Sequence, residues 1–479
     1  MGKRQVMELR QFYIDGAWVD PLEARDFAVI NPATESAIAT ISLAGDDDVE
    51  RAVAAAKKAF AGYAATSVAE RLAWFERLLR IYQRRADEMT NAMSSEMGAP
   101  VTFSREVQTP CGEGHIEVIM EALGDFRFEG RSPRGGSRVV HEPVGVAALI
   151  TPWNWPINQV VVKVLPALAA GCTCVLKPSE ESPLSALLFA EMIDEAGFPP
   201  GAFNLINGHG PVAGAGLSGH PDVDMVSFTG STRAGIAVAK AAADTVKRVT
   251  LELGGKSPNL LFADADLPSA VAWSVAACFA NSGQTCDAPT RLLVEGSVYQ
   301  EAKEIAARTA RATLVGDPAR EGDHIGPVVN AQQFENIQRL IQRGIDEGAT
   351  LLAGGTGRPE GLEVGYYVKP TLFADVAPDM TVNREEIFGP VLCMMPFDNE
   401  EEAIRLANDT RYGLGACVQT GDAERAERLA RALRAGNVSI NGQAYDYDAP
   451  FGGMKQSGNG RENGVFGLQD YLDLKTITG

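Results

Sequence analysis

Residues 144–179 read VGVAALITPWNWPINQVVVKVLPALAAGCTCVLKPS, and this stretch decides the fold class. Its first apolar run predicts a buried strand that ends in a turn at residues 151–156. The next apolar residues, as far as Gly171, predict a helix, and residues 172–179 predict a second strand. A strand, a helix and a second strand in this order are typical of a parallel sheet.

The same alternation continues toward the C-terminus. Helices are predicted at residues 183–197 and 232–244, and strands at residues 225–231 and 248–255. A second alternating series begins near Ser257, and its predicted elements cover residues 267–280, 290–296, 298–314, 401–409 and 423–436. Strands that alternate with helices of this length predict an α/β protein with mostly parallel, doubly wound sheets.

The region before residue 144 has a different pattern. Residues 12–20, FYIDGAWVD, predict a β-hairpin because apolar and polar residues alternate around an Asp-Gly turn. Helices are predicted at residues 45–63, 67–98 and 103–123. Residues 130–143 are rich in Gly, Arg and Ser, so we interpret them as a connector or an arm.

Composition excludes several classes of protein. The chain has 479 residues, 45% of them hydrophobic and 22% charged, which is ordinary for a globular protein with about two or three domains. Asp and Glu number 62 against 43 Lys and Arg, a net charge of −19, which argues against nucleic acid and anionic membranes as partners. The N-terminus lacks the apolar run of a secretory signal, and no stretch reaches the roughly 18 uninterrupted apolar residues of a membrane span.

The seven cysteines mostly have apolar neighbours, which favours reduced thiols and a cytoplasmic protein. The five histidines show no spacing typical of metal ligands, and Cys172 and Cys174 lie in a predicted strand. We therefore expect no metal site.

Five segments combine polar residues with positions at the ends of predicted elements: TPWNWP (151–156), KPSEESP (177–183), SFTGSTRAG (227–235), LELGGKSP (251–258) and FANSGQTCDAPTR (279–291). The amide of Asn154 could stabilise an oxyanion, or it could serve only the turn. Glu180 could bind a ribose hydroxyl, or it could start a solvated helix. Glu252 could act as a general base, or it could be the outward residue of a strand.

The other two segments allow similar alternatives. Gly230 and Ser231 could form an anion site at a helix N-terminus, although the Gly-x-Gly-x-x-Gly spacing is absent. Taken alone, Cys286 is better interpreted as a small buried side chain than as a nucleophile. Joint occurrence changes that interpretation. The five segments are followed by EEIFGP (385–390) and PFGGMKQSG (450–458), and the whole set, from about residue 31 to residue 475, resembles the aldehyde dehydrogenase superfamily.

This resemblance implies a role for each matching residue. Cys286 would be the nucleophile, Glu252 the general base, and Asn154 with the Cys286 backbone N–H the oxyanion hole. Lys163 and Glu462 match residues proposed to relay protons from the base. The residues that match the family's cofactor site are Thr151, Pro152, Trp153, Lys177, Glu180, Gly230, Ser231, Leu253, Gly254, Glu386 and Phe388.

The implied reaction is oxidation of an aldehyde to a carboxylic acid through a thiohemiacetal and then a thioester on Cys286, which water activated by Glu252 hydrolyses. Glu252 favours hydrolysis over transfer of the acyl group to coenzyme A. Glu180 favours NAD⁺, although NADP⁺ is possible, because a carboxylate repels a 2′-phosphate. The alternatives are a coenzyme-A-acylating semialdehyde dehydrogenase and a catalytically silent structural or binding member of the family.

The resemblance also implies a domain organisation. A Rossmann-like NAD-binding domain would comprise residues 1–123 and 143–251, and a catalytic domain residues 252–440. A small β arm, residues 124–142 and 465–479, would join subunits into a homodimer or homotetramer. Residues 441–464 would return and line the substrate tunnel.

The expected tunnel contains Tyr445, Tyr447 and Asp448, and Asp287 directly follows the nucleophile. One hypothesis is that these acids disfavour aldehydes that carry a carboxylate, such as succinate semialdehyde. The alternative is that the aspartates cap turns and face solvent.

Overall fold

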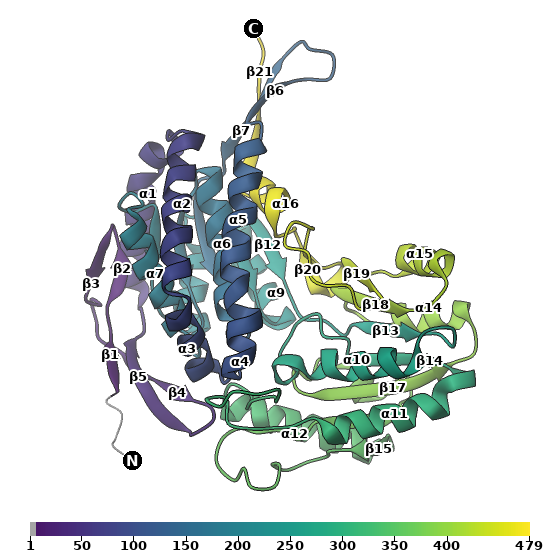
Figure 1. Ribbon diagram of the computed structural model, residues 1–479. Helices are drawn as coiled ribbons and strands as arrows, with labels where there is room; N and C mark the ends of the chain where they lie inside the picture. The colour runs from purple at the N-terminus through teal and green to yellow at the C-terminus, as the bar shows by residue number, and fades with distance from the viewer. Residues whose placement is uncertain (1–5) are drawn as a thin grey trace.

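The computed structural model describes residues 6–479 (Figure 1), and these residues form two large mixed sheets and two small ones. The first large sheet has the strand order β20-β12-β11-β8-β9-β10-β2-β3. Its strands from β12 to β10 are parallel, and β20, β2 and β3 join them in antiparallel pairs. The bounds are β2 Phe12–Ile14, β3 Ala17–Val19, β8 Val146–Ile150, β9 Thr173–Lys177, β10 Phe203–Leu205, β11 Met225–Thr229, β12 Arg248–Glu252 and β20 Gly458–Asn459.

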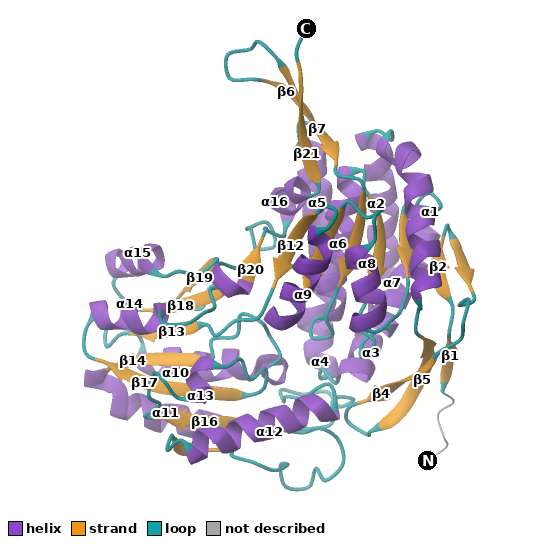
Figure 2. Ribbon diagram, turned by 180° about the vertical axis from the view of Figure 1, so that it is seen from behind, coloured by secondary structure: helices purple, strands orange, loops and turns teal. Residues whose placement is uncertain are grey.

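Helices cover both faces of this sheet (Figures 1 and 2). Strand β8 shows why both faces are apolar. Ala147 and Leu149 belong to one buried core, whereas Ala148 and Ile150 belong to another. The surrounding helices are α1 Asp46–Ala64, α2 Val68–Arg84, α3 Ala86–Met97, α4 Val101–Phe103, η1 Ser104–Gln108, α5 Thr109–Asp125, α6 Pro156–Ala170, α7 Leu184–Ala196, η2 Gly210–Gly214, α8 Ala215–Gly219 and α9 Thr232–Ala243. This arrangement confirms the doubly wound α/β fold.

The second large sheet has the order β15-β16-β17-β14-β13-β18-β19, with β15 antiparallel to β16 and the other pairs parallel. It too has an apolar core on each face. Its strands are β13 Pro258–Leu261, β14 Arg291–Glu295, β15 Thr350–Ala353, β16 Thr371–Ala374, β17 Val391–Phe397, β18 Gly415–Gln419 and β19 Asn437–Ile440. Its helices are α10 Leu267–Phe279, η3 Ala280–Gly283, η4 Gly296–Val298, α11 Tyr299–Ala312, α12 Ala331–Asp346, α13 Thr381–Arg384, α14 Glu400–Asn408 and α15 Ala423–Ala432.

The two small sheets lie at the periphery. One has the order β1-β5-β4, with β1 Met7–Leu9, β4 Asp26–Asn31 and β5 Ser36–Ser42. The other pairs β21 (Leu472–Ile477) with β7 (Arg138–Pro143) and β7 with β6 (Glu129–Arg131). This second sheet projects away from both bodies and carries the C-terminus (Figure 1). Before it, the chain passes through η5 Lys455–Ser457 and α16 Gly464–Asp470.

Most predicted elements from residue 144 to residue 255 form where expected, and the hairpin at residues 12–20 forms as β2 and β3. The helix predicted at residues 67–98 is wrong as a single element. The chain leaves helical geometry at Arg85 (φ −104°, ψ 15°), where α2 ends and α3 begins. Its predicted end is confirmed, because Gly98 adopts the left-handed conformation (φ 81°) that closes α3. The sheet β1-β5-β4 and helix α12 were not anticipated.

Within residues 6–479, no helix is both long and apolar enough to cross a membrane. The same residues contain no group of three or more His, Cys, Asp or Glu side chains arranged to hold a metal ion. All seven cysteines are free.

Candidate active site

The carboxyl ends of four adjacent parallel strands, β12, β11, β8 and β9, meet at one edge of the first sheet. The turn after each strand carries predicted site residues. Backbone hydrogen bonds join these turns in pairs: Thr151 N–H donates to the Lys177 carbonyl (3.1 Å), and Gly230 N–H donates to the Glu252 carbonyl (3.0 Å). Because the strand ends are adjacent, segments far apart in sequence form one surface.

A cleft of about 520 Å³ opens at this edge. Its other wall is formed by residues between 286 and 388, which belong to the part of the chain that contains the second sheet. The predicted residues that line it are Pro152, Trp153, Asn154, Gly230, Ser231, Leu253, Gly254, Cys286, Glu386 and Phe388. Lining residues that sequence reasoning missed are Thr229, Gln333, Asn336, Arg339, Leu340, Thr381, Glu385 and Ile387. Thr151, Lys163, Lys177, Glu180, Glu252, Glu462, Asp287, Tyr445, Tyr447 and Asp448 are not among the lining residues.

Cys286 follows a turn whose conformation is held from several sides. Asn281 and Ser282 have positive φ angles of 52° and 58°. Gly283 is also left-handed (φ 73°), and a Cβ there would lie 2.0 Å from the Gly389 carbonyl oxygen. The side chain of Gln284 accepts a hydrogen bond from Val329 N–H (3.0 Å) and donates to the Asn281 carbonyl (3.1 Å). Left-handed geometry and buried hydrogen bonds thus fix the direction in which the Cys286 side chain leaves the backbone.

Asn154 connects the turn after β8 to this cysteine turn. Its buried Nδ2 donates to the Gln284 carbonyl (3.1 Å), and its carbonyl accepts from Asn281 Nδ2 (2.8 Å). Trp155 adds a second link, since its Nε1 donates to Thr285 Oγ1 (3.0 Å). The second N–H of the Asn154 amide has no acceptor among residues 6–479, so a donor remains beside Cys286 in the cleft.

Burial raises the pKa of the Cys286 thiol well above its ordinary value, and the nearby charges of Asp287 and Glu252 raise it further. An attack by this sulfur on a substrate would therefore need a base nearby to take the thiol proton.

Glu252 lies at the end of β12 with only 5% of its surface exposed. Neither of its carboxyl oxygens has a hydrogen-bond partner within the described residues. Burial raises the pKa of Glu252 well above its ordinary range, and the charge of Glu462 raises it further. Lys163 and Arg461 offset part of this increase. A buried carboxyl group without partners is costly to fold, and its raised pKa makes it a stronger base.

Lys163 and Glu462 form a buried ion pair near Glu252, with Nζ and Oε1 2.5 Å apart. Lys163 Nζ also donates to Ser227 Oγ on β11 (3.2 Å). A chain of polar contacts therefore runs from Glu462 through Lys163 to Ser227, close to the candidate base.

Glu386 and Phe388 occupy the opposite wall of the cleft. Gly255 N–H donates to Glu386 Oε1 (3.0 Å), and a Cβ on Gly254 would lie 2.1 Å from Oε2, so this carboxylate needs a glycine beside it. Burial raises the pKa of Glu386 to about 7, although the Gly255 N–H lowers it in part.

The Phe388 backbone is left-handed (φ 56°), and its ring meets the Trp153 ring edge to face at 5.4 Å. Gln333 on α12 donates to the carbonyls of Phe388 (2.8 Å) and Ile387 (3.2 Å), which fixes this loop. No local sequence signal pointed to Gln333, because its partners lie 54 and 55 residues away.

The features of the cleft fit an elongated, phosphate-bearing cofactor. Helix α9 begins at the cleft, capped by Ser231 Oγ, which accepts from Ala234 N–H (3.3 Å). Thr229 Oγ1 is buried beside it and has no partner within residues 6–479. A helix N-terminus attracts phosphate, and an unpaired buried hydroxyl and a buried carboxylate can bind sugar hydroxyls.

Lys177 and Glu180 form a second polar cluster at the end of β9. Lys177 Nζ lies 3.4 Å from Glu180 Oε2 and donates to the Gly208 carbonyl (2.6 Å). His209 was not predicted as a site residue, yet its Nδ1 lies 2.7 Å from Glu180 Oε1. Burial alone would raise the pKa of Glu180, but Lys177 and His209 more than offset it and lower the pKa.

The residues predicted for the tunnel lie outside this cleft. Tyr447 packs edge to face on His115 of α5 (4.9 Å) and on Tyr445 (5.1 Å), and Asn463 Nδ2 donates to Tyr445 Oη (2.7 Å). Asp448 is exposed, and its backbone N–H donates to Asp446 Oδ1 (3.0 Å), which is a turn contact.

Asp287 differs from these exposed acids. Burial raises its pKa, and no side-chain partner binds its carboxylate within residues 6–479.

Comparison with known proteins agrees with this geometry. A model of the aldehyde dehydrogenase family matches residues 18–477. The 3-succinoylsemialdehyde-pyridine dehydrogenase of a Pseudomonas species is 51% identical over 473 residues, which are 98% of this chain and 99% of that protein.

Solved structures of relatives have the same fold. Aldehyde dehydrogenase from Bartonella henselae aligns with a TM-score of 0.97 and 51% identity over 99% of this chain and 100% of that chain. A mutant of aldehyde dehydrogenase C from Pseudomonas syringae was solved in complex with NAD⁺ and octanal. It aligns with a TM-score of 0.97 and 50% identity over 98% of this chain and 96% of that chain. The chain therefore belongs to the aldehyde dehydrogenase family.

Proposed function

We propose that this aldehyde dehydrogenase oxidises an aldehyde to the carboxylic acid with NAD⁺, using Cys286 as the nucleophile. The observation that carries the proposal is the arrangement of three groups. Cys286 and the free N–H of Asn154 face one cleft, and the unpaired carboxyl group of Glu252 lies behind them. Relatives solved with NAD⁺ support the cofactor assignment.

The residues present fit NAD⁺ as follows. The N-terminus of α9, with Gly230 and Ser231, would hold the phosphates, and Lys177 and Glu180 would hold the adenosine ribose. Glu386 would bind the nicotinamide ribose. Phe388, Trp153, Pro152, Thr151, Leu253 and Gly254 would supply the walls. When bound, NAD⁺ supplies the hydride acceptor that converts the thiohemiacetal into a thioester.

Chemistry at Cys286 follows from its neighbours. As the sulfur attacks the aldehyde carbon, Glu252 takes the thiol proton, and the new alkoxide receives hydrogen bonds from Asn154 Nδ2 and the Cys286 backbone N–H. Glu252 later removes a proton from the water that hydrolyses the thioester. Lys163 and Glu462 provide the route by which Glu252 loses the thiol proton, so that it is a carboxylate again before it acts on water, and by which the proton from water then leaves.

We assign the hydrolytic reaction rather than acyl transfer to coenzyme A, because Glu252 is present and buried where it can activate water. A silent binding protein is disfavoured because Cys286, Asn154 and Glu252 are all retained in one site.

The test is a panel of aldehydes assayed with NAD⁺ and with NADP⁺, both with and without coenzyme A. We expect NADH and free carboxylate without coenzyme A. Acyl-coenzyme A as the obligatory product would overturn the assignment.

For the substrate we propose a neutral aldehyde with an apolar or aromatic body. Tyr445, Tyr447, Phe451 and His115 form an aromatic cluster, and Asp287 would repel a second carboxylate. Two relatives support this proposal by the aldehydes that their names mention: one is a 3-succinoylsemialdehyde-pyridine dehydrogenase, and the other was solved with octanal. Asp446 and Asp448 have no part in this proposal, because both are exposed and the Asp446 side chain caps a turn by accepting from Asp448 N–H. We expect kcat/KM for a neutral aldehyde to exceed that for succinate semialdehyde by about tenfold, and a preference for the semialdehyde would contradict the proposal.

The organisation of the chain follows the same assignment. We propose that residues 6–123 and 143–251 form the NAD-binding domain and residues 252–440 the catalytic domain, with residues 441–464 returning along the tunnel. The first five residues of the predicted domain lie outside the described residues. The projecting sheet of β6, β7 and β21, within residues 124–142 and 465–479, would join a homodimer or homotetramer; Leu474 is 70% exposed on it. Free thiols on all seven cysteines favour a cytoplasmic location. Light scattering measures the subunit number directly.

A further inference from the structure

We propose that His209 is a specificity-determining residue that lets this enzyme accept NADP⁺ beside NAD⁺. It does so by pairing with Glu180, the carboxylate that would otherwise repel the 2′-phosphate, and by offering that phosphate a second cation. This inference rests on the proposed function, because it needs Glu180 at the adenosine ribose.

The contacts of Glu180 carry the first step. Its two oxygens face two different bases, with Oε1 2.7 Å from His209 Nδ1 and Oε2 3.4 Å from Lys177 Nζ. A carboxylate held between an ammonium group and an imidazole repels an incoming phosphate less than a free carboxylate does. Glu180 therefore excludes NADP⁺ less strongly in this chain than an unpaired acid at the same position would.

The two bases differ in what they can do for a ligand. Lys177 has a side chain only 3% exposed, and its ammonium also donates to the Gly208 carbonyl (2.6 Å). His209 has 46% of its side chain exposed. His209 can therefore turn toward a ligand, whereas Lys177 is held in place.

The position of the histidine ring is also defined by the fold. It meets the Phe27 ring of β4 edge to face at 5.4 Å. Its carbonyl accepts hydrogen bonds from Val212 N–H (3.1 Å) and Gly214 N–H (3.4 Å) at the start of η2. The backbone is thus anchored while the polar edge of the ring faces the ribose-binding carboxylate.

His209 lies among charged side chains that bear on its contact with Glu180. The titratable and charged groups that face it are Glu180, Lys177 and Glu181, and burial raises the pKa of Glu181. Phe27 and the backbone of η2 supply its other contacts.

The test measures binding rather than turnover. The dissociation constants of NAD⁺ and NADP⁺ are determined by isothermal titration calorimetry without aldehyde, at about pH 6 and about pH 8.5. The proteins are the wild type, His209→Gln, and the control His324→Gln, whose ring instead contacts the Asp317 carbonyl. Because a phosphate monoester also loses charge near pH 6, the decisive quantity is the difference between the wild type and His209→Gln.

We expect His209→Gln to weaken binding of NADP⁺ relative to NAD⁺ by about tenfold, as removal of one polar partner of Glu180 implies. NAD⁺ affinity should change by less than about threefold, and His324→Gln should match the wild type. His209→Phe, which keeps a ring against Phe27, should behave like His209→Gln if charge rather than packing is responsible.

Equal NADP⁺-to-NAD⁺ ratios in the wild type and both His209 variants, at both pH values, would overturn the inference while leaving the proposed function intact. Failure of the wild type to bind either dinucleotide would instead overturn the proposed function. The two failures are therefore distinguishable.

Discussion

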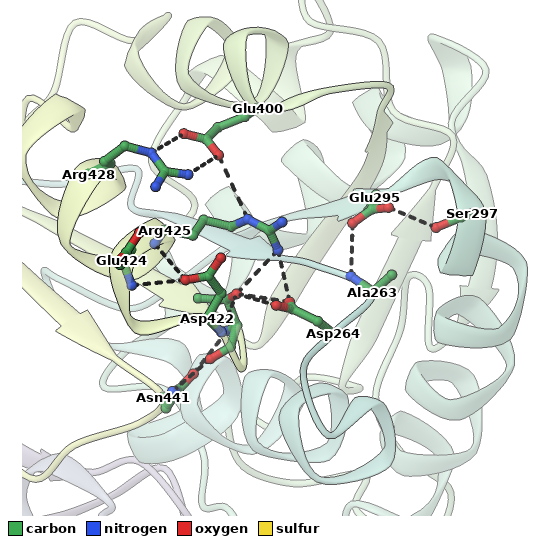
Figure 3. Close-up of polar contacts among 11 residues, drawn as sticks. Ala263, Asp264, Glu295, Ser297, Glu400, Asp422, Glu424, Arg425, Arg428 and Asn441 are labelled. Atoms are coloured by element: carbon green, nitrogen blue, oxygen red, sulfur yellow. Dashed lines mark hydrogen bonds and ion pairs between the residues drawn. The ribbon is translucent and has the colours of Figure 1, made fainter.

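Acidic side chains occupy two contrasting environments in this chain. At the outer end of the second sheet, Arg425 lies 3.0 Å from Asp264 and 3.7 Å from Glu400, and Arg428 lies 3.1 Å from Glu400 (Figure 3). Asp422 caps α15 by accepting from two backbone N–H groups. Behind the cleft, by contrast, Glu252 has neither a hydrogen bond nor an ion-pair partner within residues 6–479.

The difference separates structural charges from functional ones. The outer acids are partly exposed and paired, an arrangement that contributes about 1 kcal/mol or less per pair. The inner acid is buried and unpaired, which destabilises the folded chain. A protein retains such a group where its raised pKa serves a reaction, and the predictions below test this distinction from the largest effect to the smallest.

The largest effect is expected for Cys286→Ala. Loss of the nucleophile should lower kcat by about 10⁴-fold or more, because no thioester can form. NADH production measures the loss. The same variant should still bind NAD⁺ in calorimetry, because Cys286 is only one of many residues that line the cleft. Retention of more than a few per cent of activity would contradict the mechanism.

Glu252→Gln should lower kcat by about 10²- to 10⁴-fold, because water then lacks its base. The first turnover of NADH should slow together with the steady rate, since Glu252 also takes the thiol proton. In the wild type, kcat should rise with pH through a range well above pH 4.5, because the pKa of Glu252 is raised by burial and by Glu462. Stopped-flow absorbance and a pH–rate profile check both points.

The free energy of unfolding of Glu252→Gln should rise relative to the wild type, whereas its kcat falls. An acid whose pKa is raised on folding binds its proton more tightly in the native state than in the unfolded state. It therefore destabilises the fold as pH rises from the unfolded pKa toward the folded pKa. Glu252→Gln should match the wild type near pH 4 and become more stable at higher pH. Urea unfolding at several pH values measures the difference, and a less stable variant at pH 8 would show that Glu252 has a structural partner.

The sequence predicts the strands of the first sheet better than it predicts the details of the candidate active site. Alternating apolar runs predict β8 to β12, since each strand is buried on both faces and is separated by a helix of ordinary length. The identities of Cys286, Glu252 and Asn154 follow from the joint motifs. The left-handed backbone at Asn281 and Ser282 could not be predicted, because side-chain hydrogen bonds to the distant carbonyls of Asn154 and Gly326 hold it. His209 and Gln333 were missed because their partners lie 29 and 55 residues away.

Gly283→Ala tests whether the cysteine turn tolerates a side chain. The new Cβ would meet the Gly389 carbonyl oxygen at 2.0 Å, so we expect unfolding free energy to fall by more than about 2 kcal/mol, with loss of activity. Gly348→Ala is the matched control, because Gly348 is also left-handed (φ 91°) but has open space around it. The control should lose only about 1 kcal/mol, the cost of the backbone conformation alone. Equal losses would mean that the approach of Gly389 is not tight.

The smallest effect is expected for Asp264→Asn in the outer network. The amide keeps the shape but removes the charge that faces Arg425, and it can still accept the hydrogen bond from Thr420 Oγ1 (2.8 Å). The free energy of unfolding should fall by about 0.5–1 kcal/mol at low salt and by less at high salt, because this pair is partly exposed and screened. Steady-state kcat should stay within about twofold of the wild type, because Asp264 follows the carboxyl end of β13 whereas Cys286 precedes the amino end of the parallel neighbour β14. Replacement of an acid by its amide would thus lower the free energy of unfolding slightly at Asp264 and raise it at Glu252. If the free energy of unfolding changed in the same direction at both positions, the distinction between paired and unpaired acids would be lost.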